Sequence, residues 1–198
     1  MSESSLSVAN AAPRGTARGM DVRPLARGAA VTLSAAGVVA LAFASLPLEK
    51  AIVAAFAGAV MVVLAAIVIE RGIIPNRIVL PAAGIVLVGQ IALFPDRAGE
   101  WLLAALLAAI VFMIPQLLGR AWMGMGDAKL ALLLGATLGW GVVGAVLIAF
   151  VCVFPVSLGL LIYDGRAASK RTVPFGPFLS LGGLIVLFGP HLAGLPTG

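Results

Sequence analysis

The sequence predicts an all-α membrane protein, a polytopic helix bundle of six to seven transmembrane segments. Hydrophobic residues make up 62% of the chain and charged residues only 11%, whereas ordinary globular proteins are nearer half apolar and a quarter charged. The mean hydropathy is +1.15. The apolar residues also lie in several long runs, so lipid must cover much of the surface of the chain.

The chain divides into a short tail and one membrane-embedded domain. Residues 1–28 are rich in Ser, Ala, Gly and Arg and lack an apolar stripe, so we expect a flexible basic tail. A cleaved signal peptide is disfavoured, because this basic stretch is long for such a signal. The remaining part, 29–198, contains seven apolar segments, at about 29–47, 51–69, 78–94, 101–118, 128–139, 141–163 and 176–194.

The fifth segment is short for a span, which needs roughly 20 residues. We keep it separate because Gly139, Trp140 and Gly141 predict a break with an interfacial tryptophan. With seven segments, eleven of the thirteen Lys and Arg residues fall in alternate connections. By the positive-inside rule the N-terminus is cytoplasmic and the C-terminus is outside. The formal charge of +5 therefore indicates contact with a lipid bilayer, and we expect no nucleic acid partner.

Polar side chains inside the apolar segments are few. We expect Gln90 and Cys152 to pack between helices rather than to catalyse a reaction. Cys152 is the only cysteine, so the chain can form no internal disulfide and no cysteine-rich zinc site. We expect neither a metal nor a cofactor.

Charged residues gather instead in connections with unusual local sequence. Before the fifth segment, Gly124 and Gly126 free the backbone, and Asp127 stands where a helix would begin. Its carboxylate either caps that helix, which these local features favour, or serves as a general base at the membrane surface. Lys129 follows it.

Two further connections have a comparable character. Pro75 and Asn76 predict a tight turn after the second segment, where Glu70 is the only acid and is ordinarily a surface residue at a helix end. Before the last segment, two prolines and a glycine favour a fixed extended shape. In the predicted topology all three connections lie at the cytoplasmic face. The residues of the last one are Pro174, Phe175, Gly176, Pro177 and Phe178.

These three motifs together resemble a known family. Gly-Met-Gly-Asp at 124–127, Ile-Pro-Asn at 74–76 and Pro-Phe-Gly-Pro-Phe at 174–178 are similar to the prepilin peptidases (type IV leader peptidases), which are GxGD-type intramembrane aspartic proteases. The resemblance covers roughly 50–190. With one cysteine, the chain looks like the compact form without the zinc-binding methylase loop, so we assign it no zinc and no methylation.

The resemblance implies a membrane aspartic endopeptidase of the bacterial or archaeal cytoplasmic membrane. It would remove the basic leader from type IV prepilins or pseudopilins at the cytoplasmic face, with Asp127 as one catalytic carboxylate. The family's other aspartate lies seven residues before the proline of the Ile-Pro-Asn turn. That position is Val68, and a valine cannot share a proton with Asp127 as aspartic proteolysis requires.

Three explanations of Val68 stay open. Glu70 is a substitute only if the helix unwinds, because two residues correspond to about 200° around a helix. Asp164 could approach from the sixth segment. Alternatively, the chain is a catalytically disabled homologue that binds prepilins or assists pilus or secretion assembly. A small transporter is disfavoured, because the segments hold no charge pair. The sequence does not fix the oligomeric state.

Overall fold

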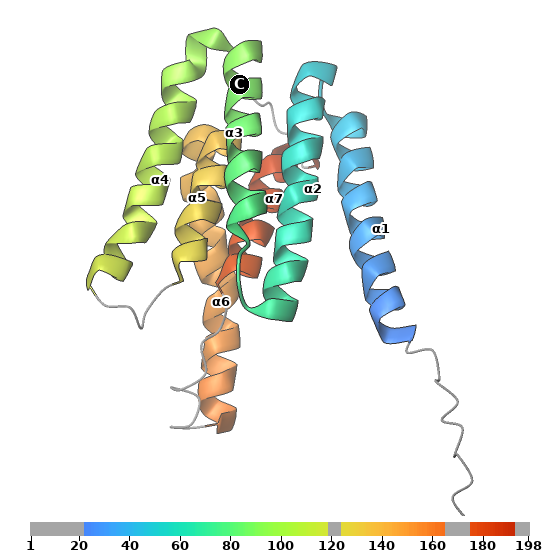
Figure 1. Ribbon diagram of the computed structural model, residues 1–198, viewed down its shortest axis with the longest axis vertical. Helices are drawn as coiled ribbons and strands as arrows, with labels where there is room; N and C mark the ends of the chain where they lie inside the picture. Colours follow the sequence, from blue (N-terminus) through green and yellow to red (C-terminus); the bar gives the residue numbers. More distant parts are fainter. Residues whose placement is uncertain (1–21, 119–123, 165–174, 193–198) are drawn as a thin grey trace, which may run out of the picture.

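The computed structural model describes residues 22–118, 124–164 and 175–192, and this part of the chain is helical without a strand. Seven α-helices alternate in direction along the bundle (Figure 1), and each coincides closely with one predicted apolar segment. The all-α polytopic prediction is confirmed. The helices are α1 (Val22–Ser45), α2 (Leu48–Arg71), α3 (Asn76–Leu93), α4 (Ala98–Leu118), α5 (Met125–Leu138), α6 (Val142–Asp164) and α7 (Gly176–Leu192).

The N-terminal boundary differs from the prediction. Helix α1 begins at Val22, so residues 22–28, which were expected to belong to the tail, are helical. An N-terminal helix can continue beyond its apolar part because its backbone hydrogen bonds are satisfied internally. The rest of the predicted tail, 1–21, lies outside the described residues.

Five stretches of the described chain are long and apolar enough to cross a membrane. Helix α7 is a shorter apolar helix, and α5 and α6 count as one stretch. The chain nevertheless turns between them, because Gly139 has φ +56°, a region that favours glycine. The predicted break is therefore confirmed, while the number of membrane spans stays a prediction. The stretches are Arg27–Ser45, Leu48–Arg71, Asn76–Leu93, Pro95–Pro115 and Met125–Gly159.

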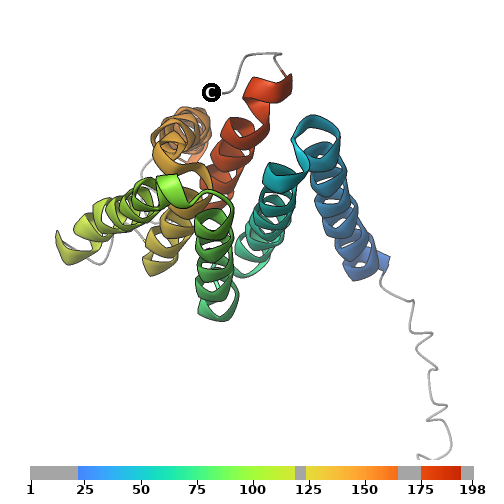
Figure 2. The ribbon, with the colours of Figure 1, turned by 90° about the horizontal axis from the view of Figure 1, so that it is seen from above.

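Helix α5 lies at the centre of the bundle. Seen from above, α1 and α4 stand at opposite sides, with α5 and α7 between them (Figure 2). The main hydrophobic core contains Leu130, Leu133 and Leu134 of α5, packed with residues of α2, α3, α4, α6 and α7. A second, smaller core joins the upper half of α1 to α2 and α7 through Ala42, Ala54 and Phe188.

Small residues allow the central helices to touch through their backbones. A Cβ atom on Gly135 would stand 2.5 Å from Ala105 Cα of α4, so α4 and α5 are in direct contact there. Gly182 of α7 lies equally close to the Ala145 carbonyl oxygen of α6. The expectation that Gly135 and its neighbours support close packing is confirmed.

The same close packing brings one buried polar side chain to a helix end. Gln90 of α3 is 7% exposed, and its Nε2 donates a hydrogen bond to the Thr137 carbonyl oxygen at 3.1 Å. Thr137 lies near the end of α5, where carbonyl groups lose their helical partners. Gln90 is thus a packing residue, as its sequence context predicted.

Candidate active site

Asp127 is buried near the start of α5. The N-cap residue of this helix is Gly124, and no side chain caps it. Asp127 is therefore the third helical residue, and the simple N-cap interpretation is wrong in its position. A backbone hydrogen bond from Gly124 nevertheless reaches the Asp127 carboxyl group, as in a capping box. The side chain is 8% exposed.

The turn between α2 and α3 lies against this helix start. Helix α2 ends at Gly72, which has φ +67° and donates its N–H to the Val68 carbonyl oxygen at 2.8 Å. Pro75 then precedes α3 in an extended conformation. Between them, the Ile74 side chain reaches Gly126, where a Cβ atom would stand 2.7 Å from Ile74 Cβ. The second glycine of the Gly-Met-Gly-Asp motif therefore has no room for a side chain.

The start of α7 approaches the same point. A Cβ atom on Gly176 would lie 3.3 Å from Ile74 Cδ1, 3.4 Å from Val68 Cγ1 and 3.5 Å from Asp127 Oδ1. Val68, Asp127 and Gly176 therefore converge. The three motif segments, far apart in the sequence, meet at one end of the bundle, the lower end in Figure 1.

Aromatic and polar contacts hold these segments in place. The Phe175 ring packs 6.0 Å from Phe112 of α4 and 5.1 Å from Phe150 of α6 between ring centroids. Lys129 Nζ donates a hydrogen bond to Asn76 Oδ1 at 2.6 Å, which joins α5 to α3. Pro174 lies outside the described residues.

Sequence reasoning did not foresee the aromatic contacts, because no local pattern links Phe112 and Phe150 to a turn far along the chain. It also missed the contact of Ile74 with Gly126, although Ile74 belongs to the Ile-Pro-Asn motif and carries that signal. Pro177 lines an apolar cavity on the other side of α7, so it follows the site without facing Asp127.

The structure separates Val68 from Glu70. Val68 is 3% exposed and faces Asp127, while Glu70 is exposed and lines a cavity with Arg27 and Arg71 on the side of α1. Because the two residues stand about 200° apart on α2, one helix cannot present both to Asp127. The structure does not bring Glu70 to this site. Whether Glu70 takes part in chemistry stays a prediction.

Asp127 is the only buried acidic side chain among those the structure describes. Asp164 is the last residue of α6, but its side chain lies outside the described part. In that part no group of three His, Cys, Asp or Glu side chains could hold a metal ion. The arrangement therefore presents one carboxyl group, a valine opposite it, and a backbone approach at Gly176.

Comparison with known proteins adds the family. The model of the type IV leader peptidase family matches residues 55–160. A prepilin leader peptidase/N-methyltransferase of Aeromonas salmonicida is 31% identical over 134 residues, 65% of this chain and 46% of that protein. The same-named protein of Aeromonas hydrophila is 32% identical over 135 residues, with the same two shares.

A third relative of that name, from Burkholderia pseudomallei, is 41% identical over 80 residues, 40% of this chain and 26% of the relative. This chain thus spans about half or less of the length of the curated relatives that it matches. No solved structure matches it. Because the family model covers more than half of the chain and includes both Val68 and Asp127, the chain belongs to the type IV leader peptidase family, as its three motifs indicated.

Proposed function

We propose that this protein binds the leader peptides of type IV prepilins or pseudopilins at the end of the bundle that carries Asp127, without cutting them by the two-carboxylate mechanism. The names of its relatives support the substrate class. The single observation that carries the second half of the proposal is the position of Val68. Its Cγ1 and Asp127 Oδ1 both approach the same point beside Gly176, at 3.4 and 3.5 Å.

Aspartic proteolysis explains why this position matters. One carboxylate activates a water molecule, and a second carboxyl group, which shares its proton, donates to the scissile carbonyl. Here the methyl groups of Val68 fill the space opposite Asp127, and methyl groups can neither hold that water nor transfer a proton. A leader peptide bound at this end therefore meets one reactive group instead of two.

The orientation of the site is part of the proposal. We place the Asp127 end, with the starts of α1 and α7, at the cytoplasmic face of a bacterial or archaeal inner membrane. Support comes from the eleven Lys and Arg residues in alternate connections, because cytoplasmic loops carry an excess of these residues. A leader on a newly made prepilin would be accessible from that face.

A second candidate is a working aspartic endopeptidase that removes the leader, with Glu70 or Asp164 as the second carboxylate. One observation favours it: Asp127 is retained in a buried position, and burying a carboxyl group costs free energy. Such costs persist most often where the group has a function. This candidate requires α2 to unwind near Gly72, or the end of α6 to approach Asp127.

The test is leader removal from a candidate prepilin that is co-expressed with the full chain. We expect no mobility shift with the wild type and a shift with Val68→Asp, which restores a carboxyl group opposite Asp127. Val68→Asn is the matched control, since it has the same shape without an acid. Adding Asp127→Asn to Val68→Asp should abolish cleavage.

Other outcomes separate the two candidates. Leader removal by the wild type that is lost in Asp127→Asn would overturn the non-cutting proposal and establish the peptidase. In that case Glu70→Gln decides whether the glutamate is the second acid. Binding is tested separately, by crosslinking the prepilin to wild type and to Val68→Asn. The absence of any crosslink in both would exclude the leader-binding proposal.

A further inference from the structure

Two adjoining cavities lie where the lower half of α1 separates from α2 and α7. The upper half of α1 is held by the small core around Ala42. Toward the Asp127 end no such core forms, and the first cavity opens between α1, α2 and α7, with a volume of about 640 Å³. The second, of about 670 Å³, lies between α1 and α2 and shares Val31 and Ala66 with the first.

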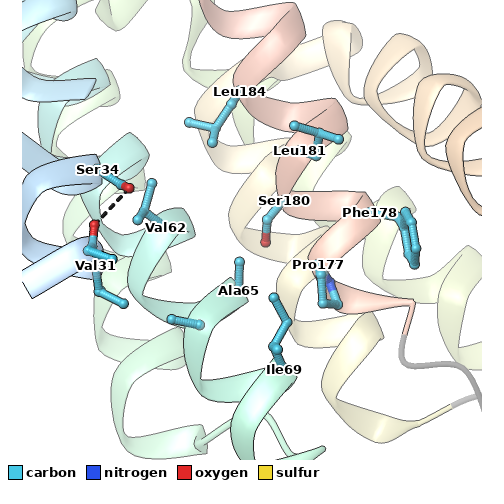
Figure 3. Close-up of a pocket in the computed structure, with 12 residues that line it drawn as sticks. Val31, Ser34, Val62, Ala65, Ile69, Pro177, Phe178, Ser180, Leu181 and Leu184 are labelled. Carbon is cyan, nitrogen blue, oxygen red and sulfur yellow. Dashed lines mark hydrogen bonds between the residues drawn. The ribbon is translucent and has the colours of Figure 1, made fainter. Parts of the chain in front are cut away.

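The first cavity is almost wholly apolar. Its two hydroxyl groups differ: Ser34 Oγ donates to the Ala30 carbonyl oxygen at 2.8 Å, whereas Ser180 Oγ has no hydrogen-bond partner in the described structure. Ser180 is 1% exposed, and Figure 3 shows its hydroxyl between α7 and Ala65 of α2. A buried hydroxyl without a partner is costly, so a ligand with an acceptor would stabilise this wall.

The second cavity is charged. Arg27, Arg71 and Glu70 line it, and all three side chains are exposed. Among the residues with described side chains the one ion pair is Arg97 with Glu100, so both arginines are available for an anion. Arg27 opens the first apolar stretch, and Arg71 closes the second. Both therefore stand at the same end of the bundle, where a lipid head group would lie.

From this juxtaposition we infer that the two cavities bind one phosphatidylglycerol-type lipid, with its acyl chain between α1, α2 and α7 and its phosphodiester on Arg27 and Arg71. The charges match, since two arginines and one glutamate leave +1 for a head group of −1. Glu70 accepts hydrogen bonds from the glycerol hydroxyls. Ser180, about 4.5 Å along the helix from Pro177 at the cavity's edge, donates to an ester carbonyl.

The inference assigns Glu70 a role that does not involve Asp127. It also commits to one occupant. A zwitterionic ethanolamine lipid, free phosphate and an apolar helix of another protein are the competing occupants, and each predicts a different response in the test below. Arginine prefers phosphate oxygens because its planar group can donate two hydrogen bonds at once.

The test uses the full chain in neutral detergent, with short-chain phosphatidylglycerol as the probe and its affinity measured from the rise in Tm. We expect phosphatidylglycerol to raise Tm and phosphatidylcholine to raise it less. Each arginine should contribute about fivefold to the affinity, so Arg27→Gln with Arg71→Gln should lower it about 25-fold. Arg77→Gln, at the same end of the bundle, is the matched control and should leave it unchanged.

Further arms identify the occupant. Glu70→Gln should leave phosphatidylglycerol affinity unchanged or raise it; a loss of affinity together with tighter binding of phosphatidylethanolamine would overturn the inference in favour of a zwitterionic lipid. Inorganic phosphate that raises Tm as much as the lipid would also overturn it.

The apolar half is tested by filling it. Ala66→Trp should block lipid binding, while Ala92→Trp, on the exposed side of α3, should not. Unchanged affinity in Ala66→Trp would mean that no acyl chain enters the groove and would overturn the inference. Displacement of the lipid by a purified prepilin, with no change in the double arginine variant, would overturn it in favour of a helix.

Discussion

Helices α5 and α1 are both apolar, yet they have opposite surroundings. In α5, most side chains from Asp127 to Thr137 are buried by four neighbouring helices. In α1, Ala42 is the one buried residue among the described side chains. In a soluble protein this difference would appear as a difference in composition, but lipid accepts an apolar face as readily as protein does. Backbone contacts, rather than hydrophobicity, set the central helix apart.

The largest expected effect comes from making the same substitution in both helices. Gly135→Ala in α5 places a Cβ atom 2.5 Å from Ala105 Cα, and backbone atoms cannot move aside. We expect the free energy of unfolding to fall by about 3 kcal/mol. Gly37→Ala in α1, where nothing lies within 4 Å, should raise it by about 0.5 kcal/mol. Unfolding in mixed micelles measures both, and equal effects would refute the contrast.

The next effect compares the two glycines of the Gly-Met-Gly-Asp motif. Gly126→Ala would place a Cβ atom 2.7 Å from Ile74 Cβ, while Gly124 has its nearest neighbours at 4.0 Å. We expect Gly126→Ala to lower the free energy of unfolding by about 2 kcal/mol and Gly124→Ala to lower it much less. Ile74→Ala should remove most of the penalty of Gly126→Ala in a double-mutant cycle. Additive effects would show that Ile74 is not the cause.

A smaller effect is expected at the end of α5. Gln90→Met keeps the length of the side chain but removes the donor to the Thr137 carbonyl oxygen. The loss of one buried hydrogen bond should cost about 1 kcal/mol of unfolding free energy. Leu93→Met, on the exposed part of α3, is a control that should be neutral. No difference between the two would mean that the oxygen finds another partner.

The smallest effect concerns the surface contact at the start of α5. Lys129→Met removes the hydrogen bond to Asn76 Oδ1, and we expect a loss of about 0.5 kcal/mol in unfolding free energy, because exposed polar contacts contribute little. Asn76→Ala should cost the same, and the double variant no more than either. A loss above about 2 kcal/mol would indicate that this link, and not the packing around Gly135, holds α5.

Some features of the fold and the site could be predicted because they depend on local chemistry. Apolar run lengths and the Gly139 break predicted seven helices, and alternation of direction then placed the three motifs at one end. Glu70 illustrates the limit. Its spacing from Val68 predicted that it would point away from Asp127, but the cavity that it shares with Arg27 depends on how α1 leans away from α2.

The sequence by itself determined the fold class, the order of the helices, the family motifs and the loss of one expected acid at Val68, because each depends on residue type and spacing along the chain. Only the tertiary structure decided that Val68 faces Asp127 beside Gly176, that Asp127 is the third residue of its helix, and that α5 is central. Those outcomes depend on which helix faces meet, and in a chain apolar on nearly every face hydrophobicity does not choose among them. Small residues that let backbones touch do.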